Sequence, residues 1–243
     1  MQTVDLEDFE RINELKRERR LERKRKRRNK LLWHVALCSA VVVIFLSIAA
    51  VLLKAEANEK ESQKAEELEY KVEQAPEIQV ALLPVNEYSR PGTPLNQVKG
   101  IVIHYTGNPG TTAVQNRGYF ESLAETKTTK ASSHYIIGLS GEVIQCVPLD
   151  EIAYASNERN VDTISIECCI NNEAGKFTDK TYDTLVHLTA WLVGEYDLTI
   201  SDIIRHYDVT GKICPKYFVE HESAWEDFKL DVKTYIETNG VKK

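Results

Sequence analysis

Three residues in the C-terminal part of the chain bring an imidazole, an amine and a thiol close together: His206, Lys212 and Cys214. A histidine nitrogen and a cysteine thiolate are both good Zn²⁺ ligands, and a catalytic zinc usually takes three protein ligands and leaves one position for water. We expect the third ligand to be His104, because it ends a β-branched segment that would deliver its side chain to the edge of a sheet. The residue types therefore predict a zinc site made of His104, His206 and Cys214.

The segments that must position these residues alternate between strand-like and helix-like patterns from about residue 80. We expect strands over residues 100–105, 133–139, 142–147, 163–169 and 202–206, and helices over residues 113–125, 179–196 and 223–238. Ser140 and Gly141 indicate a tight hairpin between two of the strands. Thr178 is suited to cap the helix over 179–196, whose apolar residues fall on one side. The pattern predicts an α/β domain with a mixed central sheet flanked by helices.

A different kind of segment lies near the N-terminus. Residues 31–53 contain no Asp, Glu, Lys or Arg and are long enough to cross a bilayer, which takes about 20 apolar residues. Basic residues directly precede this segment and acidic residues follow it, so the positive-inside rule places the N-terminus in the cytoplasm. A cleaved signal peptide is the alternative, but its apolar core is about 7–15 residues long. We expect a retained single-pass transmembrane helix in a cell membrane, with the rest of the chain extracytoplasmic.

The charge distribution agrees with different environments for residues 1–30 and for the rest of the chain. Residues 1–30 hold 12 Lys and Arg against 7 Asp and Glu, whereas the remaining chain holds 19 basic and 30 acidic residues. A basic tail beside a membrane span fixes topology and attracts anionic lipid, and it does not by itself predict nucleic-acid binding. We therefore expect a basic cytoplasmic tail over 1–30, the transmembrane helix over 31–53, a charged helical stalk and linker over 54–79, and the folded domain over 80–240.

The cysteines leave one question open. Cys168 and Cys169 are adjacent in an expected strand and point to opposite faces, so at most one of them is placed to meet Cys146. An oxidising exterior permits such a disulfide. A disulfide at Cys214 would exclude the zinc site.

Four short motifs of the expected domain resemble a known family. They are residues 103–106 (IHYT), 133–138 (SHYIIG), 164–167 (ISIE) and 205–215 (RHYDVTGKICP). These motifs are similar to those of the zinc-dependent N-acetylmuramoyl-L-alanine amidases of type 2, which include phage amidase lysozymes and peptidoglycan recognition proteins. The similarity extends over about residues 80–238, and the last motif is the most specific of the four.

The resemblance implies a role for each residue of the site. His104, His206 and Cys214 would hold Zn²⁺, Glu167 would act as general base, and Lys212 would stabilise the oxyanion. The implied reaction is hydrolysis of the amide between N-acetylmuramic acid and the L-alanine of the stem peptide, with peptidoglycan as substrate. The chemistry agrees for Glu167, because a carboxylate in a mostly apolar strand is costly to bury without a partner or a task.

Two alternatives to a membrane-anchored amidase stay open, and both are non-enzymatic. Some relatives recognise peptidoglycan without cleaving it, but they typically lack the cysteine ligand that Cys214 supplies here. A membrane-anchored scaffold with an inactive domain is the second alternative. The chain also departs from the family pattern, because Ser133 stands where phage members carry a tyrosine of the site, and residues 153–157 offer no histidine. These departures put more weight on Glu167. For His134 and Tyr135, a place in the cleft and strand packing are equally good explanations.

Overall fold

The computed structural model describes residues 25–27, 47–49, 54 and 68–243. The predicted transmembrane helix over 31–53 therefore lies outside the described residues, except for 47–49. Among the residues that are described, no helix is both long and apolar enough to cross a membrane. The chain divides into two compact units, Met1–Ser62 and Gln63–Lys243, and the second holds all the predicted site residues.

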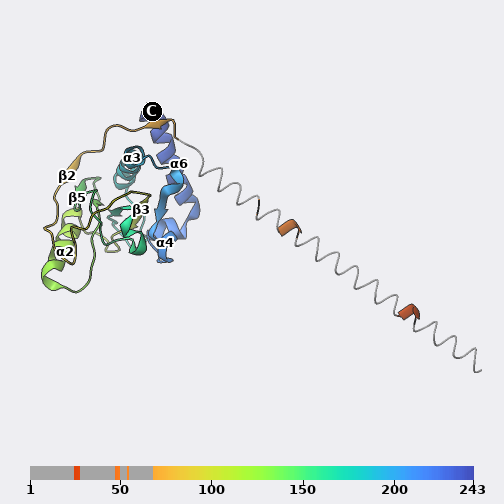
Figure 1. The fold of residues 1–243 in the computed structure, drawn as a ribbon, viewed down its shortest axis with the longest axis horizontal. Helices are drawn as coiled ribbons and strands as arrows, with labels where there is room; N and C mark the ends of the chain where they lie inside the picture. Colours follow the sequence, from red (N-terminus) through yellow and green to blue (C-terminus); the bar gives the residue numbers. More distant parts are fainter. Residues whose placement is uncertain (1–24, 28–46, 50–53, 55–67) are drawn as a thin grey trace, which may run out of the picture. The chain divides into compact units, whose positions relative to one another are not determined.

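The second unit is built on a six-stranded mixed sheet (Figure 1). Its strands in spatial order are β2 (Ile78–Val80), β5 (Val143–Gln145), β4 (Tyr135–Ile137), β6 (Ile164–Cys168), β3 (Ile101–Tyr105) and β7 (Ile203–Arg205). The β4 and β5 pair is antiparallel, as the predicted hairpin requires, and all other neighbours are parallel. The carboxyl ends of β4, β6, β3 and β7 therefore meet at one edge of the sheet.

Helices cover both faces of this sheet. Helix α2 (Ala113–Thr126) packs on the face that carries Ile136 and Ile144, while α3 (Asp179–Glu195) and α6 (Glu222–Asn239) pack on the face that carries Ile101 and Ile103. The predicted mixed α/β architecture is confirmed, and so are the three predicted helices. The predicted cap of α3 is also confirmed, since the Thr181 amide donates a hydrogen bond to the Thr178 hydroxyl at 3.1 Å.

The remaining helices of the domain are short. They are η1 (Asn157–Val161), η2 (Ile200–Asp202), α4 (His206–Thr210) and α5 (Lys216–Glu220). The prediction of a strand through residue 206 is wrong at its last position, because His206 begins α4 directly after β7.

The predicted helical stalk is wrong over residues 68–75, which are not helical. Residues Tyr70–Lys71 form strand β1, which pairs antiparallel with β8 (Val241–Lys242). Leu68 and Val72 are buried in the core that α3 and α6 share. Leu68, Tyr70 and Val72 repeat with the period of two that a strand needs, and this short pattern was hidden among charged residues. The folded domain therefore begins before residue 80 and includes β1 and β2.

The four cysteines of the domain are all free and buried. Cys168 packs in the core beneath α3 and α6, whereas Cys169 shares the core beneath α2 with Cys146. The prediction that the adjacent cysteines face opposite sides of the sheet is confirmed, and no disulfide forms among the described residues.

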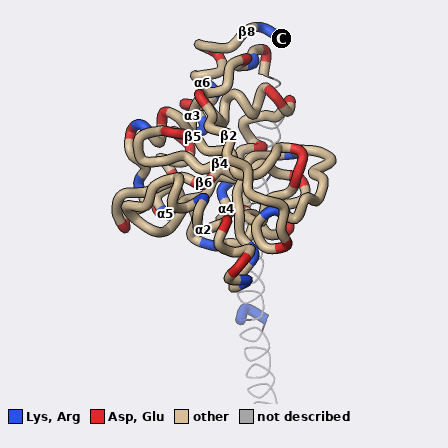
Figure 2. The backbone as a smooth tube through the Cα atoms, turned by 90° about the vertical axis from the view of Figure 1, so that its left-hand side faces the viewer, with Lys and Arg blue, Asp and Glu red and all other residues tan. Residues whose placement is uncertain are grey.

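Charged side chains are distributed unevenly between the sheet and its surroundings. Lys and Arg are interspersed with Asp and Glu over the domain in Figure 2. The six strands of the central sheet, in contrast, carry only two charged side chains, Glu167 and Arg205. Both lie near the carboxyl edge, where the predicted site residues are found.

Candidate metal centre and its pocket

The structure brings the three predicted zinc ligands together. His104 lies near the end of β3, His206 follows the neighbouring strand β7, and Cys214 lies in the loop after α4. One ligand atom from each of these residues lies within 4.8 Å of the other two, and Cys214 Sγ is 3.8 Å from His104 Nδ1. All three side chains are buried. These residues could hold a metal ion.

Local structure explains why His206 and Cys214 converge although eight positions separate them. Helix α4 makes little more than one turn and ends at Gly211, whose φ of 76° is in the left-handed region that glycine adopts readily. The chain then runs back alongside the start of α4, where the Tyr207 amide donates a 2.9 Å hydrogen bond to the Cys214 carbonyl. The eight-position spacing thus corresponds to a loop that folds back and brings the Cys214 thiol close to the His206 imidazole.

The donor set and its spacing fit zinc. Zinc–nitrogen distances of about 2.0–2.1 Å and zinc–sulfur distances of about 2.3 Å place two tetrahedral ligand atoms roughly 3.3–3.6 Å apart. The 3.8 Å between Cys214 Sγ and His104 Nδ1 needs only a small contraction to reach that range. Histidine nitrogen and cysteine sulfur both ligate zinc, and three protein ligands leave the fourth position open, as in catalytic zinc sites.

Protonation of the three ligands follows from their burial. Burial lowers the pKa of His104 and of His206, with the Lys212 charge acting in the same sense, so both imidazoles are neutral and have a lone pair to offer. Burial raises the pKa of the Cys214 thiol to about 12 in the metal-free chain. Because a coordinated thiol is deprotonated by the cation, metal binding at this site releases the Cys214 proton.

Glu167 lies beside the ligands on the same face of the sheet. It is the register partner of His104 in the parallel pair of β3 and β6. Its Oε2 atom is shielded from solvent and has no hydrogen-bond partner among the described residues. Burial raises the pKa of this carboxyl group to about 8, and the nearby Lys212 charge opposes the shift. A buried oxygen without a hydrogen-bond partner is energetically costly unless a substrate or water supplies a donor. Burial and a strongly shifted pKa are common in carboxylates of functional sites.

A pocket of about 390 Å³ joins these residues. Its lining includes all five predicted site residues: His104, Glu167, His206, Lys212 and Cys214. Lys212 is exposed in the loop that follows Gly211, and its side chain is therefore available at the mouth of the pocket.

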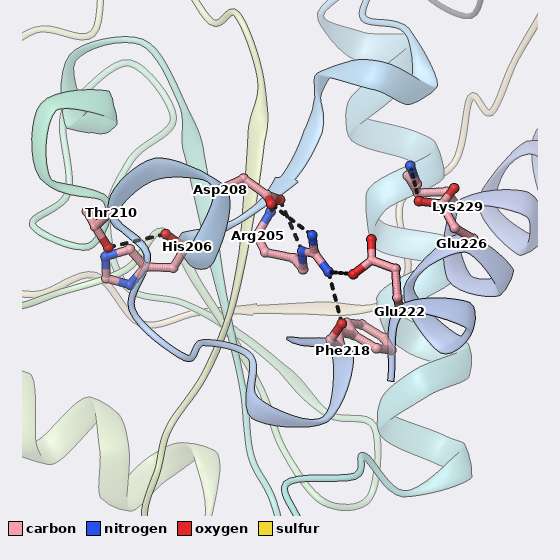
Figure 3. Close-up of polar contacts among 8 residues, drawn as sticks. All are labelled: Arg205, His206, Asp208, Thr210, Phe218, Glu222, Glu226 and Lys229. Atoms are coloured by element: carbon pink, nitrogen blue, oxygen red, sulfur yellow. Dashed lines mark hydrogen bonds and ion pairs between the residues drawn. The ribbon is translucent and has the colours of Figure 1, made fainter. Parts of the chain in front are cut away.

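An ion-pair cluster anchors the segment that carries His206 (Figure 3). The buried Arg205 guanidinium pairs with Asp208 at 2.9 Å and with Glu222 at 2.6 Å, and it also donates a 3.0 Å hydrogen bond to the Phe218 carbonyl. Arg205 thus ties the end of β7 to α4, α5 and α6. This fixes the backbone of its neighbour His206 from three sides.

The unassigned residues of the SHYIIG motif turn out to be structural. Nδ1 of His134 accepts a 3.0 Å hydrogen bond from the Ser165 amide, and its Nε2 lies 2.9 Å from the Glu151 carbonyl. Tyr135 is buried in the core beneath α3 and α6. Ser133, at the position of the phage tyrosine, is buried and donates to the Tyr135 carbonyl.

Sequence reasoning missed part of the pocket lining. Phe120 and Lys130 come from α2 and the loop after it, and Tyr154, Asn157 and Asn160 come from the segment before β6. No spacing pattern links these residues to the ligand motifs. The one indication in the sequence was the family resemblance, in which some members carry a histidine of the site in the segment that matches residues 153–157.

Comparisons with known proteins agree with this geometry. Residues 94–217 match the model of the family described as N-acetylmuramoyl-L-alanine amidase. The chain is 36% identical over 172 residues to the N-acetylmuramoyl-L-alanine amidase CwlL of Bacillus licheniformis, which covers 65% of this chain and 47% of CwlL. It is 33% identical over 182 residues to BlyA of Bacillus subtilis, which covers 66% of this chain and 48% of BlyA. The chain thus spans about half the length of these relatives.

Solved structures show the same fold. The PlyG catalytic domain superposes with a TM-score of 0.56 at 27% identity, covering 65% of this chain and 94% of that domain. PlyL superposes with a TM-score of 0.57 at 23% identity, covering 68% of this chain and all of PlyL. With the family model matching about half of the chain, the protein belongs to the N-acetylmuramoyl-L-alanine amidase family of type 2.

Proposed function

We propose that this protein is a zinc-dependent peptidoglycan hydrolase that cleaves the amide between N-acetylmuramic acid and the L-alanine of the stem peptide. The observation that carries the proposal is one pocket in which His104, His206 and Cys214 converge beside Glu167 and Lys212. The relatives CwlL and BlyA bear the name of this activity, which supports the proposal.

The three ligand residues would hold Zn²⁺, which when bound supplies a Lewis acid that polarises a carbonyl group and acidifies water. The other two residues handle protons and charge. Glu167 takes a proton from the attacking water at Oε2, which has no hydrogen-bond partner in the part of the chain that the structure describes, as the water oxygen bonds to the carbonyl carbon. The same carboxyl group then gives that proton to the departing L-alanine nitrogen as the amide bond breaks.

Lys212 contributes charge at the mouth of the pocket. Its ammonium group lies close enough to the site to lower the pKa of both imidazoles and to oppose the raised pKa of Glu167. A cation at this place stabilises the negative oxygen that develops when the carbonyl is attacked. The same charge, together with a bound metal ion, favours the ionised form of Glu167 that the first proton transfer needs.

We also propose that the enzyme is anchored to a cell membrane, with the N-terminus in the cytoplasm and the amidase domain outside. The support comes from the sequence alone: residues 31–53 are uncharged, and the basic residues lie on the N-terminal side of this segment. An extracytoplasmic domain would face peptidoglycan directly.

The full chain should be incubated with purified cell wall, with and without a zinc chelator, and newly freed L-alanine amino termini should be measured. We expect release that stops with the chelator and returns when Zn²⁺ is added. Binding of muropeptides without release, by protein that carries no stoichiometric zinc, would instead support a recognition module.

A further inference from the structure

The loop that leads into η1 supplies two adjacent residues, Ser156 and Asn157, and each contacts one histidine of the candidate metal centre. Ser156 Oγ lies 3.1 Å from His104 Nε2, and Asn157 Oδ1 lies 3.0 Å from His206 Nε2. His104 lies in β3 and His206 begins α4, and the two are 102 positions apart in the sequence. One short loop therefore reaches the second nitrogen of each ring.

In both rings this contact leaves Nδ1 for the metal. His104 Nδ1 is the atom 3.8 Å from Cys214 Sγ, on the opposite side of the ring from Ser156. In His206, Nε2 is engaged by Asn157, so Nδ1 is the remaining ligand atom. A neutral imidazole carries one proton, and with Nε2–H donated to the loop the Nδ1 lone pair is free.

The loop has its own internal support. Asn160 Oδ1 accepts hydrogen bonds from the amides of Ala155 at 3.0 Å and Ser156 at 2.6 Å. Asn157 has a φ of 52°, in the left-handed region, which asparagine tolerates better than most residues. Ser156 is fully buried, so its hydroxyl group has no water to exchange for the imidazole. These features fix the backbone that carries the two side-chain oxygens, independently of the histidines.

We propose that Ser156 and Asn157 are positioning residues that fix the Nε2–H tautomer and the ring orientation of His104 and His206, and so set the metal affinity of the centre. Metal-ligating histidines generally donate their other N–H to an oxygen acceptor, which orients the ring and raises its basicity. The inference rests on the proposed zinc site. It adds that this chain supplies both acceptors from one loop.

The test measures zinc affinity of the full chain by competition with a chromogenic chelator. Ser156→Ala and Asn157→Gly remove one acceptor each, and glycine keeps the left-handed backbone free of strain. We expect each variant to bind zinc about 10–100-fold more weakly than the parent chain. Asn157→Asp keeps an oxygen acceptor and adds a negative charge beside His206, so it should bind zinc at least as tightly as the parent chain. Asn171→Gly, in an exposed loop outside the pocket, is the matched control and should also bind like the parent.

A second readout separates positioning from loss of structure. Cobalt(II) bound at the site reports ligand geometry through its visible absorption, and we expect Ser156→Ala and Asn157→Gly to change this spectrum while Asn157→Asp does not. Thermal unfolding of the metal-free forms of Asn157→Gly and Asn157→Asp controls for folding. Parent affinity and parent spectrum in both acceptor-removing variants would overturn the inference and leave the proposed amidase intact. Failure of the parent chain to bind zinc would overturn the metal centre itself.

Discussion

Glu167 is the residue whose chemical task is easiest to separate from metal binding. Its Oε2 has no partner among the described residues, and it is not one of the three ligand atoms. Because general acid–base catalysis contributes about 10²–10⁴-fold, we expect Glu167→Gln to lower amidase turnover at least about 100-fold. Zinc stoichiometry should stay unchanged.

Wall digestion and metal analysis of the same Glu167→Gln preparation check this prediction. The matched control is Glu125→Gln, an exposed carboxylate on α2 outside the pocket, which should leave turnover unchanged. Near-normal turnover in Glu167→Gln would remove the carboxylate from the mechanism.

His134 gives a prediction about stability and pH. Burial lowers its pKa to about 4, below the usual 6.5, and Nδ1 must stay unprotonated to accept the Ser165 amide. Between pH 6.5 and 4 the unfolded chain therefore binds a proton that the folded chain does not, so stability falls as the pH falls. A shift of this size corresponds to about 3 kcal/mol of unfolding free energy.

The measurement is urea unfolding at pH 7 and pH 4 for the parent chain and for His134→Gln. Both carry the other histidines, so the difference between them isolates His134. We expect the stability advantage of the parent to shrink by about 3 kcal/mol on acidification. An advantage that does not change with pH would contradict the account.

At the scale of elements, helix α3 tests how strongly a cap predicted from sequence contributes. The Thr178 hydroxyl accepts the Thr181 amide and donates to the Leu139 carbonyl at 2.8 Å. Thr178→Ala removes both bonds, and loss of a cap costs about 1–2 kcal/mol. Thr178→Ser keeps the hydroxyl group and should recover most of that loss. Equal stability of the alanine and serine variants in urea unfolding would show that the cap is unimportant.

Elements with a strong apolar period were predictable, and those shaped by tertiary contacts were not. The strand ending at Tyr105 follows from a run of β-branched residues, and helix α3 follows from a one-sided apolar stripe. Helix α4 has a single buried residue, His206, so no periodicity marks it. The contacts of Ser156 and Asn157 depend on how the segment at the start of η1 folds against β3 and α4, which are distant in the sequence, and no local pattern encodes this.

For the whole molecule, the main revision concerns where the domain begins. Because Leu68 and Val72 are buried and β1 pairs with β8, we expect a chain that starts at residue 76 to be less stable than one that starts at residue 63. Burying two such side chains contributes about 3–5 kcal/mol in total. Urea unfolding of both truncated chains measures the difference. Equal stability would mean that residues 68–75 do not contribute to the folded domain.

The central claim is that this chain cleaves the N-acetylmuramoyl-L-alanine amide with zinc held by His104, His206 and Cys214. The most direct measurement is the release of free L-alanine amino termini from purified peptidoglycan by the full chain and by Cys214→Ser, alongside their zinc content. We predict zinc-dependent release by the parent and a loss of both zinc and release in the variant. Release that persists without zinc, or a parent chain that holds zinc and frees no L-alanine amino termini, would contradict the account.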